Sequence, residues 1–326
     1  MEDEGVQAKS SGNASGNRPV PAVEGSRDEP EAGERVVPES TSNVTLMERV
    51  LARANLQRAL KQVRSNRGAP GIDGMSVDAL PSYLKEHWPG IRAQLVAGSY
   101  RPQPVRRVEI PKPDGRMRPL GIPTVLDRFI QQAIAQVISE QWEPHFHRCS
   151  YGFRPQRSAH QAVRQLQADI RSGKRWVVDL DLEAFFDRVN HDRLMVRLKR
   201  HVADEALLRL INRYLKAGVY VGEHIQATST GVPQGGPLSP VLANVVRDEL
   251  DWELERRGHR FARYADDCNI VLGSERAGKR VMESVARFVQ DSLRLTVNAR
   301  KSAVDRPWKR KFRLHGQPQR GHAQGG

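Results

Sequence analysis

The sequence predicts an α+β fold, in which helices and strands follow one another in an irregular order. Helical spacing of apolar residues fills most of the chain, whereas strand-like alternation is confined to short runs such as Val105–Ile110 and Trp176–Leu180. This irregular order disfavours a regular βαβ repeat. At 326 residues and 36.7 kDa, the chain is long enough to bury a sizeable core in one or two domains.

Two helices come first in the part that is predicted to fold. Apolar residues recur at helical spacing from Leu46 to Arg64 and again from Ala79 to Ala97. Between them lies the loop NRGAPGIDG (66–74), which carries three glycines and a proline. The strand at Val105–Ile110 then runs into Asp114-Gly115, a strong signal for a hairpin turn.

The rest of the chain alternates between helices, short strands and Gly/Pro-rich loops. The run Arg175–Val189 opens as a strand and passes into a turn and a helix. The segment TSTGVPQGGPLSP (228–240) is predicted to be a loop. Further helices are predicted at Ile122–Trp142, within Tyr151–Ile170, and at Ala206–Val219, Val241–Arg257 and Arg276–Ser292.

Charge is distributed unevenly along the chain. Residues 1–44 hold nine acidic and four basic side chains, a net charge of −5, so the remainder carries +19 within a total of +14. The first 44 residues are rich in Ser, Gly, Pro, Asn and Glu and lack aromatic residues, which predicts a disordered acidic arm. The basic remainder indicates a polyanionic partner, most often nucleic acid, although a basic protein of another kind is the alternative.

Several classes of protein are disfavoured by composition. The two cysteines, Cys149 and Cys268, lie far apart and form no CxxC pair, so neither a zinc site nor a disulfide framework is indicated. No apolar run approaches the ~20 residues that a membrane span needs. The polar, acidic amino end does not match a secretory signal. We therefore expect a cytoplasmic protein with reduced thiols and no membrane partner.

The stretch FARYADDCNIVLG (261–273) places Asp266 and Asp267 side by side between apolar residues. Adjacent strand residues point to opposite faces, so both carboxylates reach one site only at a hairpin tip. We expect Phe261–Tyr264 to enter, Ala265–Asp267 to turn and Cys268–Leu272 to leave. Clustered carboxylates are tolerated where Mg²⁺ neutralises them, whereas solvated turn aspartates are the alternative.

A second acidic cluster lies in VVDLDLEAFFD, where Asp181 follows an apolar strand and precedes a turn. An aspartate at the end of one strand, beside a hairpin that bears two more, can hold two Mg²⁺ ions. Two ions about 4 Å apart suit in-line phosphoryl transfer, because one activates the attacking oxygen and the other stabilises the leaving oxygen.

Tyr264–Asp267 resembles the YxDD signature of reverse transcriptases, with the alanine that is typical of group II intron enzymes. Other blocks resemble motifs of that family and occur in its order: NRGAPGIDG, IPKPDGRMRPLGIPTVLDRFIQQAI, YGFRPQRSAHQAV, DLDLEAFFDRVNHDRL, GVPQGGPLSPVLANVVRDELD and LTVNARKS. The resemblance extends from about Leu46 to Lys311, which is most of the folded chain.

The resemblance implies the fingers and palm of a right-hand polymerase, with a mixed antiparallel palm sheet and packed helices. It divides the chain into the arm (1–44), a helical N-terminal extension (45–100), a reverse transcriptase domain (101–305) and an irregular tail (306–326). The implied activity is RNA-directed DNA synthesis with Mg²⁺ for a mobile group II intron. The implied partners are the intron RNA, a DNA primer or target, and dNTPs.

The resemblance also assigns site residues. Asp181, Asp266 and Asp267 match the catalytic metal ligands. The positions that match the nucleotide-binding residues are Lys112, Arg118, Phe186 and Gln234. Phe186 matches a bulky ring that leaves no room for a ribose 2′-hydroxyl, with a core phenylalanine as the alternative.

Three further positions, Tyr151, Arg154 and Arg157, resemble residues that contact the template. For Arg154 a structural role is an equal alternative.

The chain departs from the family near its carboxyl end. Ala299 replaces the usual proline, and the Leu-Gly-Phe turn expected after Lys311-Phe312 is missing. We therefore expect no thumb in this chain and interpret the Gly/Gln/Arg/His-rich tail as the product of a frame shift or truncation. An RNA-binding splicing cofactor without polymerase activity, or a degenerate remnant, is the alternative to an active enzyme.

Overall fold

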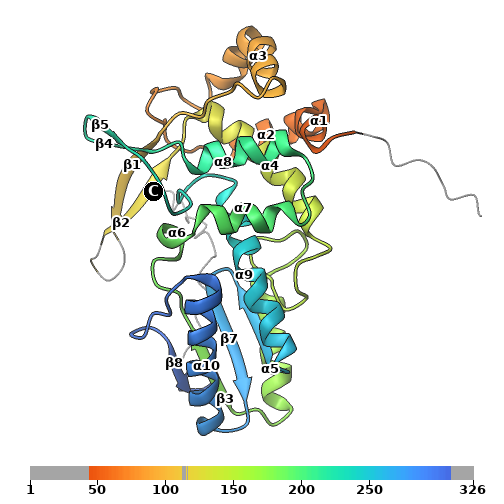
Figure 1. The fold of residues 1–326 in the computed structure, drawn as a ribbon, viewed down its shortest axis with the longest axis vertical. Helices are drawn as coiled ribbons and strands as arrows, with labels where there is room; N and C mark the ends of the chain where they lie inside the picture. The colour runs from red at the N-terminus through yellow and green to blue at the C-terminus, as the bar shows by residue number, and fades with distance from the viewer. Residues whose placement is uncertain (1–43, 112–114, 116, 310–326) are drawn as a thin grey trace, which may run out of the picture. The chain divides into compact units, whose positions relative to one another are not determined.

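The strands of the chain form two four-stranded sheets. The computed structural model describes residues 44–111, 115 and 117–309. One sheet has the strand order β2-β1-β4-β5 and the other β6-β7-β3-β8 (Figure 1). The strands are β1 (Val105–Pro111), β2 (Met117–Ile122), β3 (Trp176–Leu180), β4 (Val219–Val221), β5 (His224–Gln226), β6 (Arg260–Tyr264), β7 (Asp267–Leu272) and β8 (Ala303–Asp305). The mixture of helices with these sheets confirms the predicted α+β class.

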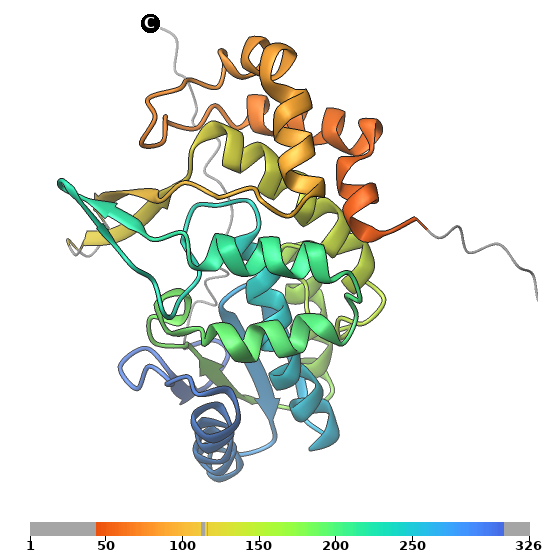
Figure 2. The ribbon, with the colours of Figure 1, turned by 45° about the horizontal axis from the view of Figure 1, so that its top comes forward.

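Helices make up most of the remaining described residues. They are α1 (Leu46–Leu51), α2 (Arg53–Ser65), α3 (Leu80–Val96), α4 (Val125–Trp142), α5 (Ala159–Arg171), α6 (Phe185–Arg188), α7 (His191–Lys199), α8 (Glu205–Leu215), α9 (Ser239–Arg256) and α10 (Glu275–Leu293). Helix α4 contacts α1, α2 and α9, and α7 lies beside α8 (Figure 2). The packed helices therefore join the N-terminal segment to the helix that leads into the β6–β7 hairpin.

Three predicted helices differ from those observed. The helix predicted over 122–142 begins at Val125, because Ile122 is still part of strand β2. The helix predicted over 46–64 is two helices, because Ala52 has an extended backbone and separates α1 from α2. The helix predicted over 206–219 ends at Leu215, and Val219 already belongs to strand β4. Gly218 precedes β4 and has a φ of 86°, a left-handed backbone conformation that residues with a Cβ rarely adopt.

The sheet β6-β7-β3-β8 is antiparallel at each of its strand pairings and has a different layer on each face. Residues such as Val178, Leu180 and Ile270 join the main core, which includes α9 and α10. Their neighbours along the strands pack instead against α5. This alternation follows from the two-residue period of a strand. We call this sheet the palm sheet.

The sheet β2-β1-β4-β5 consists of two hairpins that are joined by a short parallel pairing of β1 with β4. Strands β1 and β2 pair from Arg106–Ile122 to Pro111–Met117, so a hairpin forms where the sequence predicts one. Gly115 in its connection has a φ of 80°. Lys112, Asp114 and Arg116 lie outside the described residues, as do the predicted acidic arm up to residue 43 and the tail from residue 310.

Asp127 connects three segments of the helical part. Its buried carboxylate accepts hydrogen bonds from the Tyr100 hydroxyl at 2.8 Å, the Thr124 hydroxyl at 2.8 Å and the Tyr214 hydroxyl at 3.1 Å. The Gln103 amide donates to the same group at 3.0 Å. Burial raises the pKa of Asp127, and these donors oppose that shift.

Within the described ranges, no helix combines the length and apolarity that a bilayer span requires.

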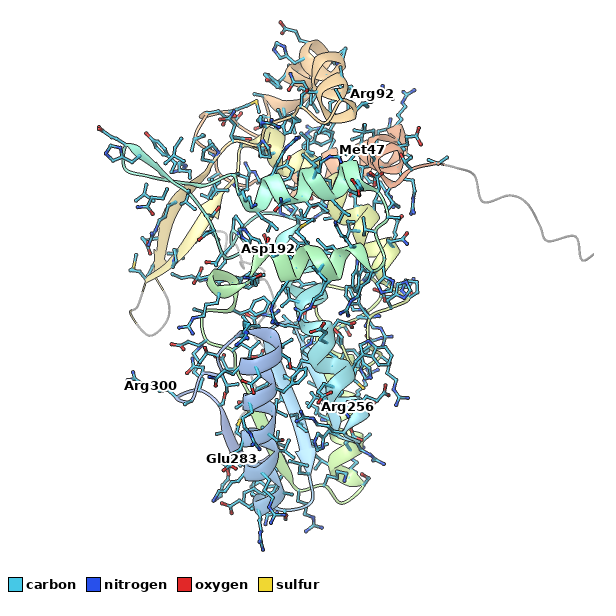
Figure 3. The ribbon with its side chains drawn as sticks, in the orientation of Figure 1. Met47, Arg92, Asp192, Arg256, Glu283 and Arg300 are labelled. Atoms are coloured by element: carbon cyan, nitrogen blue, oxygen red, sulfur yellow. The ribbon has the colours of Figure 1, made fainter. Side chains whose placement is uncertain are left out.

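We expect Asp127→Ala to lower the free energy of unfolding by about 2–4 kcal/mol, because several buried donors lose their acceptor at once. Urea denaturation measures this change. Asp192→Ala, at an exposed position in the first turn of α7 (Figure 3), is the matched control and is expected to cost about 1 kcal/mol or less. Equal losses in the two variants would contradict the assigned role.

Candidate active site

The β6–β7 hairpin turns within two residues, Ala265 and Asp266, and Asp267 already pairs with Tyr264. Ala265 has a φ of 53°, the positive value that the first residue of a type II′ turn requires. The turn is held from outside by Gly152, where an added Cβ would overlap the backbone nitrogen of Ala265. The sequence predicted a turn at 265–267, and the structure places the turn at 265–266 with Asp267 as the first residue of β7.

Pairing of β3 with β7 brings Asp181 beside Asp267. Leu180 is the partner of Cys268, so Asp181 follows at the position opposite Asp267. Cys268 belongs to the main core, so strand alternation directs Asp267 to the opposite face of the palm sheet. The two predicted metal ligands therefore lie at the same end of the sheet, with Asp181 one residue beyond β3 and Asp267 as the first residue of β7.

The segment that contains β8 fixes the backbone of Asp181. The Asn298 amide donates to its carbonyl at 2.8 Å, and its own amide donates to the Ser302 hydroxyl at 3.0 Å. Lys301 Nζ lies 3.4 Å from Asp181 Oδ2. The other carboxylate oxygen, Oδ1, is buried and has no hydrogen-bond partner among the described residues. A buried acceptor of this kind is costly unless a donor or a cation satisfies it.

Asp266 has a different environment. Its half-exposed carboxylate forms an ion pair with the fully buried guanidinium of Arg247, on α9. Across the described ranges, no three His, Cys, Asp or Glu side chains are grouped closely enough to hold a metal ion. The structure thus brings Asp181 and Asp267 to neighbouring positions, whereas the Asp266 side chain is bound to Arg247.

Buried charges underlie the hairpin. Arg263 of β6 donates to both carboxylate oxygens of Asp251 at 2.6–3.0 Å, and both side chains are buried. Burial lowers the pKa of Arg247 to about 10, against the opposing effect of Asp266, so this arginine stays charged at neutral pH. Burial, with the negative charge of Asp251, raises the pKa of Asp248 to about 6.

The predicted nucleotide-binding residues approach the palm from strand β2 and from the loop before α9. Arg118 Nε donates to Gln234 Oε1 at 2.7 Å, and Gln234 Nε2 lies 3.5 Å from Asp187 Oδ1. Gly235 has a φ of 118°, and a Cβ there would meet the carbonyl oxygen of Gly121. The loop can therefore lie against β2 only with glycine at this position.

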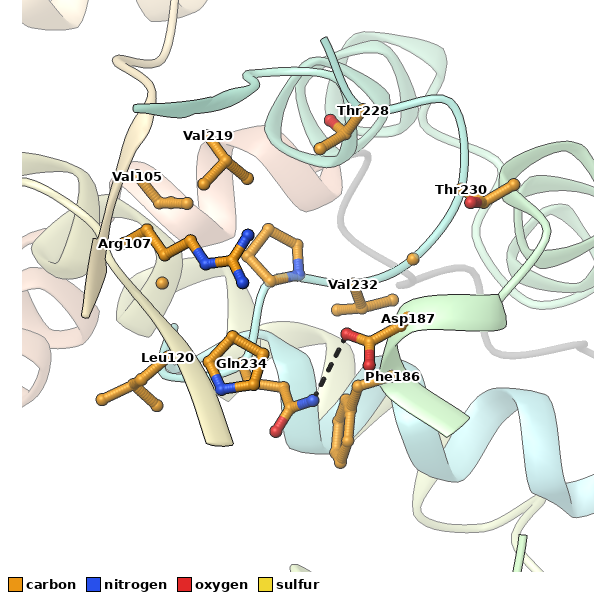
Figure 4. Close-up of a pocket in the computed structure, with 14 residues that line it drawn as sticks. Val105, Arg107, Leu120, Phe186, Asp187, Val219, Thr228, Thr230, Val232 and Gln234 are labelled. Carbon is orange, nitrogen blue, oxygen red and sulfur yellow. Dashed lines mark hydrogen bonds between the residues drawn. The ribbon is translucent and has the colours of Figure 1, made fainter. Parts of the chain in front are cut away.

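A cavity of about 840 Å³ lies between these segments. Its walls include Arg118, Phe186 and Gln234, the hairpin residues Ala265 and Asp266, and the N-terminal extension at Gln62 and Asn66. Phe186 is half-buried, whereas Phe185 is buried in the core. A second cavity, of about 370 Å³, shares Phe186 and Gln234 with the first (Figure 4). The predicted nucleotide-binding residues that the structure describes therefore face one space.

The three predicted template-binding residues differ in accessibility. The Arg154 side chain is only 3% exposed, and it donates to the Glu143 carboxylate and to the carbonyls of His147 and Ser150. Those contacts occupy its donors, which favours the structural alternative for Arg154. Arg157 is partly exposed and lies over the ring of Tyr151, 5.5 Å from its centroid. The roles of Tyr151 and Arg157 stay predictions.

Sequence reasoning assigned no role to several residues that line or support the site. Arg247 was not identified, although a single basic residue among the apolar positions of α9 was a visible signal. Lys301 lies in a block that resembles a family motif, but its contact with Asp181 spans 120 residues of sequence. Phe153, exposed and with a φ of 57°, also lines the larger cavity.

The comparisons with known proteins specify both the class of enzyme and the family. The family described as "Reverse transcriptase (RNA-dependent DNA polymerase)" matches residues 110–317, so the chain belongs to the reverse transcriptase family. The chain is 38% identical over 224 residues to the group II intron-encoded protein LtrA of Lactococcus lactis. It is 33% identical over 289 residues to protein YkfC of Escherichia coli.

A solved structure supports the fold. The telomerase of Candida albicans matches with a TM-score of 0.52 at 13% identity, over 66% of this chain and 43% of that one. For the sequence relatives, 67% of the chain matches LtrA and 76% matches YkfC. The chain spans 76% of YkfC but 37% of LtrA.

The raised pKa of Asp248 predicts a pH-dependent stability. Below about pH 4 the Asp248 carboxyl is protonated in both the folded and the unfolded chain. Between about pH 4 and 6 it ionises in the unfolded chain but stays protonated in the folded protein, so the free energy of unfolding falls as pH rises. Asp248→Asn should match the wild type near pH 4 and be more stable by about 1–3 kcal/mol at pH 7. Urea unfolding across this range measures the difference.

Asp291→Asn, at an exposed position of α10, is the control and should show no such trend. A difference between Asp248→Asn and the wild type that stays constant with pH would exclude the assigned cause.

Proposed function

We propose that the end of the palm sheet at Asp181 and Asp267, together with the larger cavity that Asp266 lines, is the active site for RNA-templated DNA synthesis in this chain. The 3′-hydroxyl of a primer attacks the α-phosphate of a dNTP, and pyrophosphate leaves. The observation that carries the proposal is the buried Oδ1 of Asp181, which has no hydrogen-bond partner among the residues that the structure describes, at the end of the sheet where Asp267 and the hairpin tip lie. A carboxylate oxygen in that position suits a cation that arrives with the substrate.

The proposed metal ligands are Asp181, Asp266 and Asp267, which would hold two Mg²⁺ ions. Their oxygens are the hard donors that Mg²⁺ prefers, and the orphaned oxygen of Asp181 fits such an ion. Bound Mg²⁺ would lower the pKa of the attacking hydroxyl and neutralise the charge on the leaving group. The Asp266 side chain is half-exposed, and on metal binding it would turn away from Arg247 toward such an ion.

The remaining residues would position the nucleotide. Arg118 would bind the triphosphate, together with Lys112 from the same hairpin, because a guanidinium can grip phosphate oxygens bidentately. Gln234, which already bonds Arg118, would hold that arginine in place and contact the nucleotide. Phe186 would lie under the sugar and exclude a 2′-hydroxyl, since its ring lines the same cavity.

The nucleic-acid partners that we propose are the RNA of a group II intron as template and a DNA primer or target. The net charge of +19 outside the first 44 residues favours phosphate contacts along such strands. Tyr151 and Arg157 would contact the template. A role in splicing of the intron RNA would rely on the same excess of positive charge.

Primer extension on an RNA template tests the reaction. Asp181→Asn should lower the rate by about 10³-fold or more, because it removes a charged ligand that developing charge requires. Asp305→Asn, on the neighbouring strand β8, is the control and should retain most of the activity. RNA binding without extension in wild type and both variants would favour the splicing cofactor instead.

Sugar selection tests the assignment of Phe186. Phe186→Val should raise the use of rNTPs relative to dNTPs by about tenfold to a hundredfold, since the smaller side chain leaves space for the 2′-hydroxyl. The ratio of kcat/KM values for dNTP and rNTP measures the change. Phe288→Val, on α10, should leave the ratio unaltered. An unchanged ratio in Phe186→Val would assign Phe186 to the core instead.

A further inference from the structure

Arg247 is an unusual residue for the interior of this protein. It lies on α9 among buried apolar neighbours such as Val246 and Leu250, and its side chain is 1% exposed. Its guanidinium carbon lies 3.5 Å from the centroid of the Phe185 ring. A charge is rarely buried at such a position unless it is paired and hydrogen-bonded.

Only part of the hydrogen-bonding capacity of Arg247 is used. Nη2 donates to Asp266 Oδ1, whereas Nε and Nη1 are buried and have no partner in the described part of the chain. A guanidinium bears donors on every nitrogen, so this arginine is only partly satisfied. The ion pair with Asp266 is therefore the main interaction that compensates its buried charge.

Arg263, nearby on β6, shows what a satisfied buried arginine looks like. It donates to Asp251 through two nitrogens, to Asn244 Oδ1 at 3.0 Å and to Ser150 Oγ at 2.7 Å. Asp251 is completely buried, so that pair cannot open without burying lone charges. The partner of Arg247 is instead 49% exposed and is a predicted metal ligand.

We propose that Arg247 is a positioning residue that competes with divalent cations for Asp266 and thereby sets the metal concentration at which the active site is complete. The inference rests on the proposed function, because it takes Asp266 to be a metal ligand. Without metal, Arg247 holds the carboxylate and neutralises it. When a divalent cation binds, Asp266 turns from Arg247 toward the cation, and Arg247 loses its carboxylate partner.

This competition has a thermodynamic consequence. Part of the free energy of metal binding is used to break the Arg247–Asp266 ion pair, so the apparent affinity is lower than that of a site without the arginine. The stacking of the guanidinium on Phe185 keeps the charge in place when the pair opens, because cation–π contact favours the buried position. Replacing Arg247 by an uncharged residue should therefore strengthen metal binding.

Binding of Mn²⁺ to the full chain, followed by electron paramagnetic resonance without nucleotide or nucleic acid, tests the proposal. Arg247→Leu should bind Mn²⁺ about five- to tenfold more tightly than the wild type, which corresponds to about 1–1.4 kcal/mol. Arg247→Gln keeps an amide donor for Asp266 but no charge, and it should tighten binding in the same direction. If Arg247→Leu does not fold, Arg247→Gln decides the question.

Two controls make the result specific. Arg256→Leu, at an exposed position near the end of the same helix (Figure 3), should leave the Mn²⁺ affinity unchanged. Asp266→Asn should remove the difference between arginine and leucine at position 247, because the competition acts through that carboxylate. Equal Mn²⁺ affinities of the wild type, Arg247→Leu and Arg247→Gln would overturn the proposal, even if their unfolding free energies differ.

The binding experiment is independent of polymerase activity. If the Mn²⁺ affinity shifts as expected but no variant extends a primer, the competition stands and the proposed reaction fails. If the wild type extends a primer and its Mg²⁺ requirement is the same in Arg247→Leu, the reaction stands and the competition fails.

Discussion

The geometry of the site depends on the buried ion pair between Arg263 and Asp251. Arg263 also donates to the carbonyl of Ala265 at 3.1 Å, so a single side chain ties strand β6, helix α9 and the hairpin turn together. Breaking such a pair by removing one partner typically costs about 3–5 kcal/mol, because a lone charge stays buried. Arg263 and Asp251 thus fix the positions of Asp266 and Asp267, although neither of them lines the larger cavity.

The two buried arginines beside the hairpin, Arg263 and Arg247, have different roles. Arg263 has a partner for each nitrogen and makes the turn rigid. Arg247 has two nitrogens without a partner in the described part of the chain, and its one carboxylate partner is half-exposed, so its pairing can be exchanged at lower cost. A polymerase palm gathers negative side chains, and the protein must compensate their repulsion whenever no metal is bound. A nearby arginine can supply that compensation in the interior.

Much of the architecture could be predicted from local pattern. Periodicity located most helices, and the Asp114-Gly115 signal located a hairpin whose strands pair as expected. The ends of elements were less predictable, because a single residue decides them: Ala52 is extended within a helical apolar pattern, and Gly218 turns the chain shortly after Leu215.

The same limit applies to the site. Sequence motifs indicated Asp181, Asp266 and Asp267. No local sequence pattern predicts that Arg247 forms an ion pair with Asp266, or that Arg154 donates its hydrogen bonds to Glu143. Those pairings join residues 19 and 11 positions apart, and they form only when the chain folds back on itself, as where α9 packs against β6. The family resemblance could supply positions for the aspartates, but it could not supply the arginine that lies beneath them.

The N-terminal helices are joined to the rest by polar contacts inside the protein rather than by a linker. Asn55 Nδ2 donates to the carbonyl of Ala133 at 3.0 Å, the Met47 amide donates to Asp204 at 2.7 Å, and Tyr100 bonds Asp127. Removal of this segment would therefore break contacts inside the protein, not only a surface connection. A deletion that begins at Val44 and ends before Arg101 would expose the apolar side of α4, and the shortened chain would aggregate instead of retaining a smaller catalytic unit.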